Sequence, residues 1–224
     1  MHGNVIHLRY ATNPREWPAA TLSGVLARLP APARARAGRY RRWQDRQAGL
    51  LGRLLLLDLA AELLPGVAPL ERLATDAYGR PYLDGVGDFD FNISHTEGFV
   101  ACAAVRGPGR VGVDVEWRRD VDPTEFDRVF TDGERRHLRG AAYRTAEFYR
   151  LWTRKEAVMK VDGRGFYLDP RGIDALAATV RIDDRTYGVR PLDLHPAVTT
   201  HVACAGTAWS VNPRPLARPP DPAP

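Results

Sequence analysis

The stretch FNISHTEGFVACAAVRGPGRVGVDVEW, residues 91–117, decides the architecture of this chain. β-Branched and aromatic residues flank the turn sequence SHTEG, which predicts two strands joined by a tight turn over residues 91–105. The glycine- and proline-containing RGPGR, residues 106–110, predicts a second tight turn. VGVDVEW, residues 111–117, then predicts a further strand. Short strands joined in this way favour a small, mostly antiparallel sheet.

Helical segments lie on both sides of these strands. Leucines at three- and four-residue spacing predict a helix over residues 33–64, which the following Pro-Gly ends. A second strong helix is predicted over residues 145–161, which the following Asp-Gly ends. An initial strand is expected at residues 4–10, and more short strands follow the second helix up to Val211. The fold class is therefore predicted to be α+β.

A short sequence echo indicates two related halves. GFVACAAV around Cys102 resembles THVACAGTAW around Cys204. We predict two similar subdomains related by a pseudo-twofold axis, each a small sheet packed with helices. The predicted boundaries are an N-terminal subdomain at 1–110, a C-terminal subdomain at 111–212 and a disordered, proline-rich tail at 213–224.

The composition is that of an ordinary soluble protein, with 224 residues of which 44% are hydrophobic and 26% charged. The longest run of large apolar residues, 54–57, is too short for a transmembrane helix. The first residues lack the apolar core of a signal peptide. The two cysteines make neither a disulfide framework nor a metal-ligand spacing. We therefore expect a cytoplasmic protein with no membrane partner.

The positive charge of the chain is concentrated in one segment. The net charge is +5, and residues 34–53 contain seven arginines and one acidic residue. Such a cluster indicates a local anion-binding site. A solvated, arginine-rich helix face explains the segment equally well when it is taken alone.

Asp114 and Glu116 lie two residues apart in the predicted strand 111–117, so their carboxylates point to the same face. Like charges on one face repel unless a cation lies between them. Ligands that offer only oxygen favour Mg²⁺ or another hard cation. An exposed acidic strand face is the commoner explanation of an isolated pair of this kind.

Glu156 and Lys160 are four residues apart in the second predicted helix and are therefore neighbours on one face. Either the two residues form a simple surface ion pair, or Glu156 is a third metal ligand and the Lys160 ammonium is directed at a phosphate.

Ser94 and His95 do not indicate a hydrolase, because adjacent residues of a strand face opposite ways and no G-x-S-x-G elbow is present. His95 is either an anion donor at the strand end or a plain turn residue.

Four motifs in order make this sequence similar to the Sfp-type 4′-phosphopantetheinyl transferases. They are GRP (79–81), FNISH (91–95), VGVDVE (111–116) and FYRLWTRKEAVMKVDGRGF (148–166). The resemblance extends over residues 33–170. It implies that the protein transfers 4′-phosphopantetheine from coenzyme A to a serine hydroxyl of a carrier protein and releases adenosine 3′,5′-bisphosphate.

The resemblance also implies which residues bind the substrate and the metal. It assigns Asp114, Glu116 and Glu156 to Mg²⁺, or Mn²⁺, on the pyrophosphate of coenzyme A. It assigns catalytic roles to Glu156, Lys160 and His95, and either Glu156 or a water on the metal is the base for the serine. The residues implied to contact coenzyme A are Arg34, Arg36, Arg46, Arg80, Ser94, His95 and Lys160. Arg46 is preferred for the 3′-phosphate, because Ala48 stands where some relatives carry arginine.

The implied partners are coenzyme A and an acyl or peptidyl carrier protein of a fatty-acid, polyketide or peptide synthase, with no nucleic acid. A monomer is expected, because two subdomains supply within one chain what single-subdomain relatives obtain by oligomerising. The alternative function is a basic nucleic-acid-binding module that uses the arginines between Arg34 and Arg53. That alternative needs no Mg²⁺ and gives the three carboxylates no role.

Overall fold

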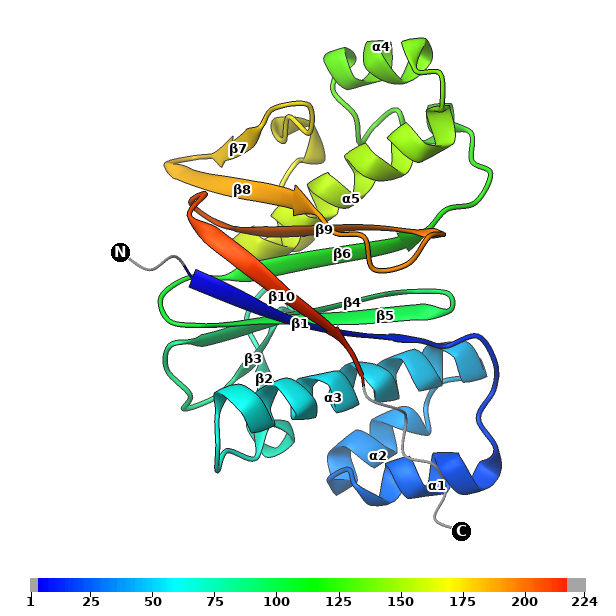
Figure 1. Ribbon diagram of the computed structural model, residues 1–224, viewed down its shortest axis with the longest axis vertical. Helices are drawn as coiled ribbons and strands as arrows, with labels where there is room; N and C mark the ends of the chain where they lie inside the picture. Colours follow the sequence, from blue (N-terminus) through cyan, green and yellow to red (C-terminus); the bar gives the residue numbers. More distant parts are fainter. Residues whose placement is uncertain (1–3, 217–224) are drawn as a thin grey trace.

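Two four-stranded sheets, each with one long helix on its outer face, make up the protein (Figure 1). The computed structural model describes residues 4–216, apart from the side chain at position 166. The helices are α1 (Ala19–Ala27), α2 (Ala31–Ala37), α3 (Trp43–Leu63), α4 (Asp132–Gly140) and α5 (Arg144–Asp162). The strands are β1 (Asn4–Thr12), β2 (Leu73–Thr75), β3 (Pro81–Leu83), β4 (Phe89–Thr96), β5 (Phe99–Arg106), β6 (Val111–Trp117), β7 (Thr179–Ile182), β8 (Arg185–Pro191), β9 (Val198–Ala205) and β10 (Trp209–Pro215).

The first sheet has the strand order β10-β1-β5-β4, and its outer face is covered by α3. β5 pairs antiparallel with β1 and β4, whereas β1 and β10 are parallel. The leucines of α3 pack against Phe91, Val100 and Cys102 of the sheet. The leucine periodicity of the sequence therefore marks the helix face that is buried on this sheet.

The second sheet has the strand order β6-β9-β8-β7, is antiparallel throughout and is covered by α5. Val113 and Val115 of β6 point away from α5 into a core shared with the inner face of the first sheet, which includes Ala101 and Ala103. The alternate positions of β6 therefore face α5. The layers run helix, sheet, sheet, helix (Figure 1).

The predicted α+β class with two small, mostly antiparallel sheets is confirmed. The two echo strands, β5 and β9, occupy matching places, since each has a sheet neighbour on both sides and the long helix of its own sheet against it. Each also buries its cysteine, Cys102 or Cys204. The sequence echo thus marks the central strands on which the two helices pack.

The helix predicted over residues 33–64 is wrong in its first part. The structure has two helices, α2 and α3, separated by residues 38–42. In one continuous helix, Arg36, Arg39 and Arg42 would lie three residues apart on a single face, where like charges repel. The interruption spreads these side chains over two helices and the connection between them.

The C-terminal residues also depart from the prediction. Residues 213–215 were expected in a disordered tail, but they belong to β10, and Pro213 and Pro215 pair with Leu8 and Tyr10 of β1. Proline is tolerated here because β10 is an edge strand, where a missing N–H breaks no ladder. The remainder of the predicted tail, residues 217–224, lies outside the described residues. β10 follows the second sheet in sequence but completes the first, so the predicted subdomain 111–212 contributes a strand to its partner.

A row of side chains joins β4 to β6, which are not paired through their backbones. The side chains at positions 90, 92, 94 and 96 of β4 accept hydrogen bonds from the backbone N–H groups of residues 111, 113, 115 and 117 of β6, at distances from 2.8 to 3.3 Å. The four acceptors are Asp90, Asn92, Ser94 and Thr96. These bonds satisfy the edge of β6 and fix its register against β4. Ser94 is thereby held beside the acidic part of β6.

Gly112 lets α5 lie close against β6. An ideal Cβ at this position would stand 2.1 Å from the carbonyl oxygen of Ala157 and 2.6 Å from the backbone nitrogen of Val161. Both are backbone atoms of α5, so no side chain can rotate away to make room. This close approach brings the residues of α5 within reach of those on β6.

Gly112→Ala is therefore expected to destabilise the protein by about 1–3 kcal/mol, because α5 must move outward to admit the methyl group. The free energy of unfolding in urea measures the loss. Gly140→Ala is the matched control, since a Cβ at Gly140 meets nothing within 4 Å. A Gly112→Ala protein as stable as this control would show that α5 does not need the close contact.

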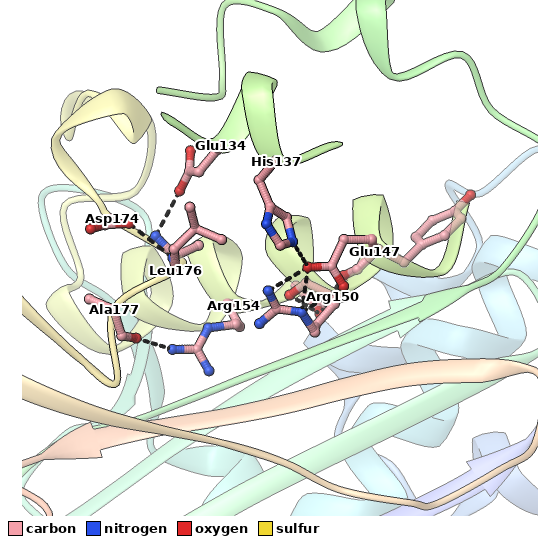
Figure 2. A network of polar contacts seen from close by, with 11 residues as sticks. Glu134, His137, Glu147, Arg150, Arg154, Asp174, Leu176 and Ala177 are labelled. Carbon is pink, nitrogen blue, oxygen red and sulfur yellow. Dashed lines mark hydrogen bonds and ion pairs between the residues drawn. The ribbon is translucent and has the colours of Figure 1, made fainter. Parts of the chain in front are cut away.

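A contact between His137 and Glu147 joins α4 to the first turns of α5 (Figure 2). His137 Nε2 of α4 lies 2.5 Å from Glu147 Oε1 of α5, and Arg150 Nε, also of α5, lies 2.9 Å from both oxygens of the same carboxylate. On the next turn, Arg154 donates from Nη2 to the carbonyl oxygen of Ala177, 2.6 Å away. These contacts hold the N-terminal half of α5, and its C-terminal half carries the predicted site residues.

Candidate functional site

Three predicted site residues from three elements meet in one hydrogen-bonded group. Lys160 Nζ of α5 donates to Asp114 Oδ1 of β6, 2.6 Å away, and to Ser94 Oγ of β4, 2.9 Å away. Ser94 Oγ in turn donates to Asp114 Oδ1, at 3.0 Å. Asp114 is only 3% exposed, and its second oxygen, Oδ2, is buried without a hydrogen-bond partner among the described residues. A buried carboxylate oxygen without a partner is costly, so this atom is suited to a ligand that supplies positive charge.

The other two predicted carboxylates lie in the field of Asp114. Burial and the Asp114 carboxylate raise the pKa of Glu116 to about 7, although Trp152 Nε1 donates to Glu116 Oε1 at 3.3 Å. Burial and Asp114 also raise the pKa of Glu156 above its usual value. Each of these shifts means that the negative charges disfavour one another in a place poor in water.

The acidic group fits a hard divalent cation in its chemistry. It offers oxygen ligands only, and Asp114 Oδ2 has no partner within the described range. Nevertheless, among residues 4–216 no three acidic, histidine or cysteine side chains are arranged as a complete metal site. Asp114 Oδ1 contacts the ammonium of Lys160 instead. The assignment of Asp114, Glu116 and Glu156 as metal ligands thus stays a prediction.

These pKa shifts predict how the stability of the metal-free protein depends on pH. A glutamate whose pKa rises from 4.5 in the unfolded chain to about 7 in the folded protein favours folding when it is protonated. The contribution of Glu116 to the free energy of unfolding in EDTA should therefore be fully present below pH 4.5 and be lost as the pH rises through about 7. Glu116→Gln should flatten part of this slope. An identical pH profile for both proteins in urea titrations would contradict the shifted pKa.

Ser94 and His95 face opposite sides of β4, as their adjacency predicts. Ser94 is buried and lies against Lys160, whereas His95 reaches the surface. Partial burial and the charge of Lys160 lower the pKa of His95, and Asp45 at the start of α3 opposes the shift. His95 therefore lies between the acidic group and the arginine-rich helices.

The structure spreads the predicted arginines rather than gathering them around one point. Arg34 and Arg36 are exposed on α2, and Arg34 Nη1 donates to the carbonyl oxygen of Leu29 at 2.9 Å. Arg46 of α3 forms a 3.2 Å ion pair with Glu16. Which of the three binds the 3′-phosphate stays a prediction.

Arg80 lies in the wall of a cavity that Lys160 also lines, but most of its guanidinium bonds to the protein, so its predicted contact with coenzyme A stays a prediction. The residue is 8% exposed and joins three elements. Its Nη2 donates to Asp90 Oδ2 at 2.6 Å and to the carbonyl oxygen of Val111 at 2.9 Å, and its Nη1 donates to the carbonyl oxygen of Lys160. The guanidinium therefore braces β4, β6 and the end of α5 against one another. The GRP motif could not reveal this, because the acceptors come from distant segments.

A cavity of about 300 Å³ opens beside Lys160. Its wall also includes Asn92, Arg164 and two tyrosines, Tyr78 and Tyr167. The two rings meet edge to face with centroids 5.5 Å apart, and they are 52% and 80% exposed. Aromatic rings and cationic side chains around one cavity suit a phosphorylated nucleotide.

The sequence analysis did not identify Tyr78, Tyr167, Asn92 or Arg164 as site residues. A signal was present, because Tyr78 directly precedes the GRP motif and Tyr167 directly follows the GRGF motif. Their proximity depends on the turn 76–80 lying next to the end of α5. That contact joins segments about 80 residues apart, as the bond from Arg80 to the Lys160 carbonyl shows.

No helix within residues 4–216 has both the length and the apolar character needed to cross a membrane.

Two protein-family models match the chain. One is described as the 4′-phosphopantetheinyl transferase superfamily and matches residues 110–204. The other is described as 4′-phosphopantetheinyl transferase, N-terminal, and matches residues 15–107.

Individual relatives agree with these models. The 4′-phosphopantetheinyl transferase gsp of Aneurinibacillus migulanus is 33% identical over 134 residues, which are 58% of this chain and 54% of the relative. The 4′-phosphopantetheinyl transferase Sfp of Bacillus subtilis (strain 168) is 29% identical over 137 residues, 60% of either chain. The phosphopantetheinyl transferase of a Thraustochytrium species is 30% identical over 202 residues, 81% of this chain and 66% of the relative. The chain thus spans a little over half the length of the first of these relatives.

The four motifs that suggested the resemblance lie within the segments that the two models match. The resemblance is therefore confirmed, and this chain belongs to the family of Sfp-type 4′-phosphopantetheinyl transferases.

Proposed function

We propose that this protein transfers 4′-phosphopantetheine from coenzyme A to a serine hydroxyl of an acyl or peptidyl carrier protein and releases adenosine 3′,5′-bisphosphate. The observation that carries the proposal is the group formed by Ser94, Asp114 and Lys160, in which Lys160 also lines the cavity of about 300 Å³. It combines an ammonium and an unsatisfied carboxylate oxygen with space for the substrate. Family membership supplies the class of reaction.

The oxygens of Asp114, Glu116 and Glu156 would hold Mg²⁺ or Mn²⁺ on the pyrophosphate of coenzyme A. The bound cation would neutralise charge on the pyrophosphate oxygens. The buried Asp114 Oδ2, which has no hydrogen-bond partner among the described residues, supports this assignment, as do the pKa values of Glu116 and Glu156, which burial and the Asp114 carboxylate raise.

Lys160 is the residue that would contact the phosphate directly. An ammonium has three N–H donors, of which Ser94 and Asp114 accept two. The third remains for a substrate oxygen. Because the other two bonds fix the ammonium, it stabilises the developing negative charge without having to reorganise.

Glu156 is the candidate general base. Burial raises the pKa of this carboxylate in the metal-free protein, but Mg²⁺ bound to it would weaken it as a base, so a water on the metal is the alternative. One of these two bases would take the proton of the carrier serine as the serine oxygen bonds to the phosphorus that bears the pantetheine. The bond from this phosphorus to the bridging oxygen breaks, and the electron pair leaves with adenosine 3′,5′-bisphosphate.

His95, the exposed Arg34 and Arg36, and the partly buried Arg46 would form the outer part of the coenzyme A site. His95 lies on the face of β4 opposite Ser94, close to the first turn of α3, so it would link the phosphate site to the arginines. We propose that the protein acts as a cytoplasmic monomer on carrier proteins of fatty-acid, polyketide or peptide synthesis. The alternative of a nucleic-acid-binding module gains no support, because both family models describe transferases.

Mass spectrometry tests the proposal. The protein is incubated with coenzyme A, Mg²⁺ and an apo carrier protein, and the carrier should gain about 340 Da, the mass of phosphopantetheine. EDTA in excess should prevent the gain, and added Mg²⁺ should restore it. Carriers from fatty-acid, polyketide and peptide synthases are compared to find the native class.

The proposal fails if none of the three carriers gains mass while the protein binds nucleic acid tightly in EDTA. That combination would favour the nucleic-acid-binding alternative, since it requires neither the carboxylates nor a metal.

A further inference from the structure

Arg164 lies just beyond the end of α5 and lines two neighbouring cavities. One is the cavity of about 300 Å³ that Lys160 also lines. The other, of about 430 Å³, is lined by Arg110 and Arg185 as well. The Arg164 side chain is 34% exposed, so a ligand in either cavity can reach it.

Two carboxylates hold the guanidinium of Arg164 in one orientation. Its Nε lies 2.6 Å from Asp162 Oδ1 and its Nη2 lies 3.0 Å from Asp162 Oδ2, a two-pronged pair. Nη2 also donates to Asp183 Oδ2 in the turn between β7 and β8, 2.9 Å away. The Asp162 carboxylate is 2% exposed and also accepts a 3.3 Å bond from the hydroxyl of Tyr187. Asp162 is therefore fixed from the side opposite Arg164.

The backbone between these two residues is equally constrained. Gly163 adopts the left-handed conformation, with φ of 94°, and an ideal Cβ there would stand 2.4 Å from Arg110 Nη1. Arg110 Nη1 donates to the carbonyl oxygen of Asp162 at 3.2 Å. The turn that carries Arg164 is thus held by the hydrogen bond from Arg110 to the Asp162 carbonyl oxygen and by the pair between the Arg164 guanidinium and the Asp162 carboxylate.

These bonds leave part of the guanidinium available. Of its five N–H donors, those on Nε and Nη2 face the carboxylates. Nη1 makes no hydrogen bond with any residue in the range 4–216. A planar cation with one edge anchored and the other edge open is arranged to bind an oxyanion in a fixed direction.

We propose that Arg164 contacts the phosphorylated nucleotide half of coenzyme A, and that Asp162 is the positioning residue that aims it. The inference rests on the proposed function and deepens it, because it adds a cationic contact in the cavity that Lys160 also lines. Arg164 and Lys160 then both contact the same ligand, because both line the cavity of about 300 Å³.

Calorimetric binding of adenosine 3′,5′-bisphosphate and of coenzyme A to the full chain tests the inference. Arg164→Gln should raise the dissociation constant of both ligands roughly tenfold, the effect of losing one charge-assisted hydrogen bond. Arg164→Lys should recover part of the loss, because it keeps the charge but not the two-pronged geometry. Asp162→Asn should weaken binding similarly, although Asp162 itself does not touch the ligand.

Arg171→Gln is the matched control. Arg171 also pairs with an aspartate, Asp169, at 3.2 Å, but the pair is exposed and lines neither cavity. This variant should bind both ligands like the natural protein. In steady-state assays, Arg164→Gln should raise the KM for coenzyme A roughly tenfold and leave kcat and the KM for the carrier unchanged.

Two results would overturn the inference, and they are distinguishable. If the natural protein modifies a carrier and Arg164→Gln binds both ligands with unchanged affinity, the Arg164 contact is wrong while the proposed function stands. If the natural protein neither binds coenzyme A nor modifies any carrier, the proposed function fails and the inference fails with it. If Asp162→Asn does not fold, the Arg164 variants still test the inference. The Arg164 side chain is partly exposed, so these variants are expected to fold.

Discussion

Asp114→Asn is expected to slow phosphopantetheine transfer at least about a hundredfold while the protein stays folded. Asparagine keeps the size of the side chain, and its oxygen can still accept from Ser94 and Lys160. It removes the negative charge, however, and can place an amide group where Asp114 Oδ2 is now buried without a partner. A neutral amide is a weaker ligand for Mg²⁺ than a carboxylate. Initial rates of carrier modification at saturating coenzyme A measure the effect.

Asp84→Asn is the control for this experiment. Asp84 is exposed and directly follows β3. It bonds to Arg72 through its own backbone N–H and carbonyl groups, and not through its carboxylate. The control should transfer at the natural rate. If Asp114→Asn did so as well, with the same dependence on Mg²⁺ concentration, Asp114 would have no role at the metal.

Glu134→Gln is expected to lower the free energy of unfolding by about 3–5 kcal/mol. Glu134 and Lys155 are 0% and 1% exposed and form an ion pair of 2.8 Å between α4 and α5 (Figure 2 shows Glu134). The Glu134 carboxylate also accepts from the backbone of Thr131 and Ala175. Removing its charge leaves the ammonium of Lys155 buried without a counter-charge, and burial already lowers the pKa of this lysine. Urea denaturation measures the loss.

A double variant separates the cost of the unpaired charge from the value of the pair. Glu134→Gln combined with Lys155→Met should lose much less than the sum of the two single changes, because neither charge then remains alone. Glu97→Gln serves as the exposed comparison, since the Glu97–Arg119 pair is about half exposed on both sides. It should leave the urea denaturation curve close to that of the natural protein, because solvent screens an exposed pair. If Glu134→Gln had an equally small effect, the carbonyl oxygens of Pro170 and Ile173, to which the Lys155 ammonium also donates, would be sufficient partners for it.

Much of the fold could be predicted from residues that are close together in the sequence. The strands over residues 91–117 follow from alternation and from the turn residues between them, and β4, β5 and β6 lie where they were expected. The capping box of α4, in which Thr131 and Glu134 bond reciprocally, also follows from residues three apart. Each of these features depends on interactions within a few residues, which a single segment displays in full.

The sequence predicted which residues belong to the candidate site, but it did not predict which of them contact one another. The sequence named Ser94, Asp114 and Lys160, and the structure brings these three into direct contact. It did not show that Arg80 is a buried brace or that Tyr78 and Tyr167 meet across a cavity. These relations depend on the end of α5 lying against the turn that precedes β3.

The sequence by itself determined the family, the strands β4 to β6 and the helix α5, because motifs and turns are local and each is written in consecutive residues. Only the tertiary structure decided three further features. One is the crossing of β10 to the first sheet, another is the side-chain row that joins β4 to β6, and the third is the anchored orientation of Arg164. All three depend on long-range pairing, in which a donor finds its acceptor only after distant segments have packed together. The physical reason is that a hydrogen bond across the interior is specified by the position of the backbone in space, and local sequence does not contain that position.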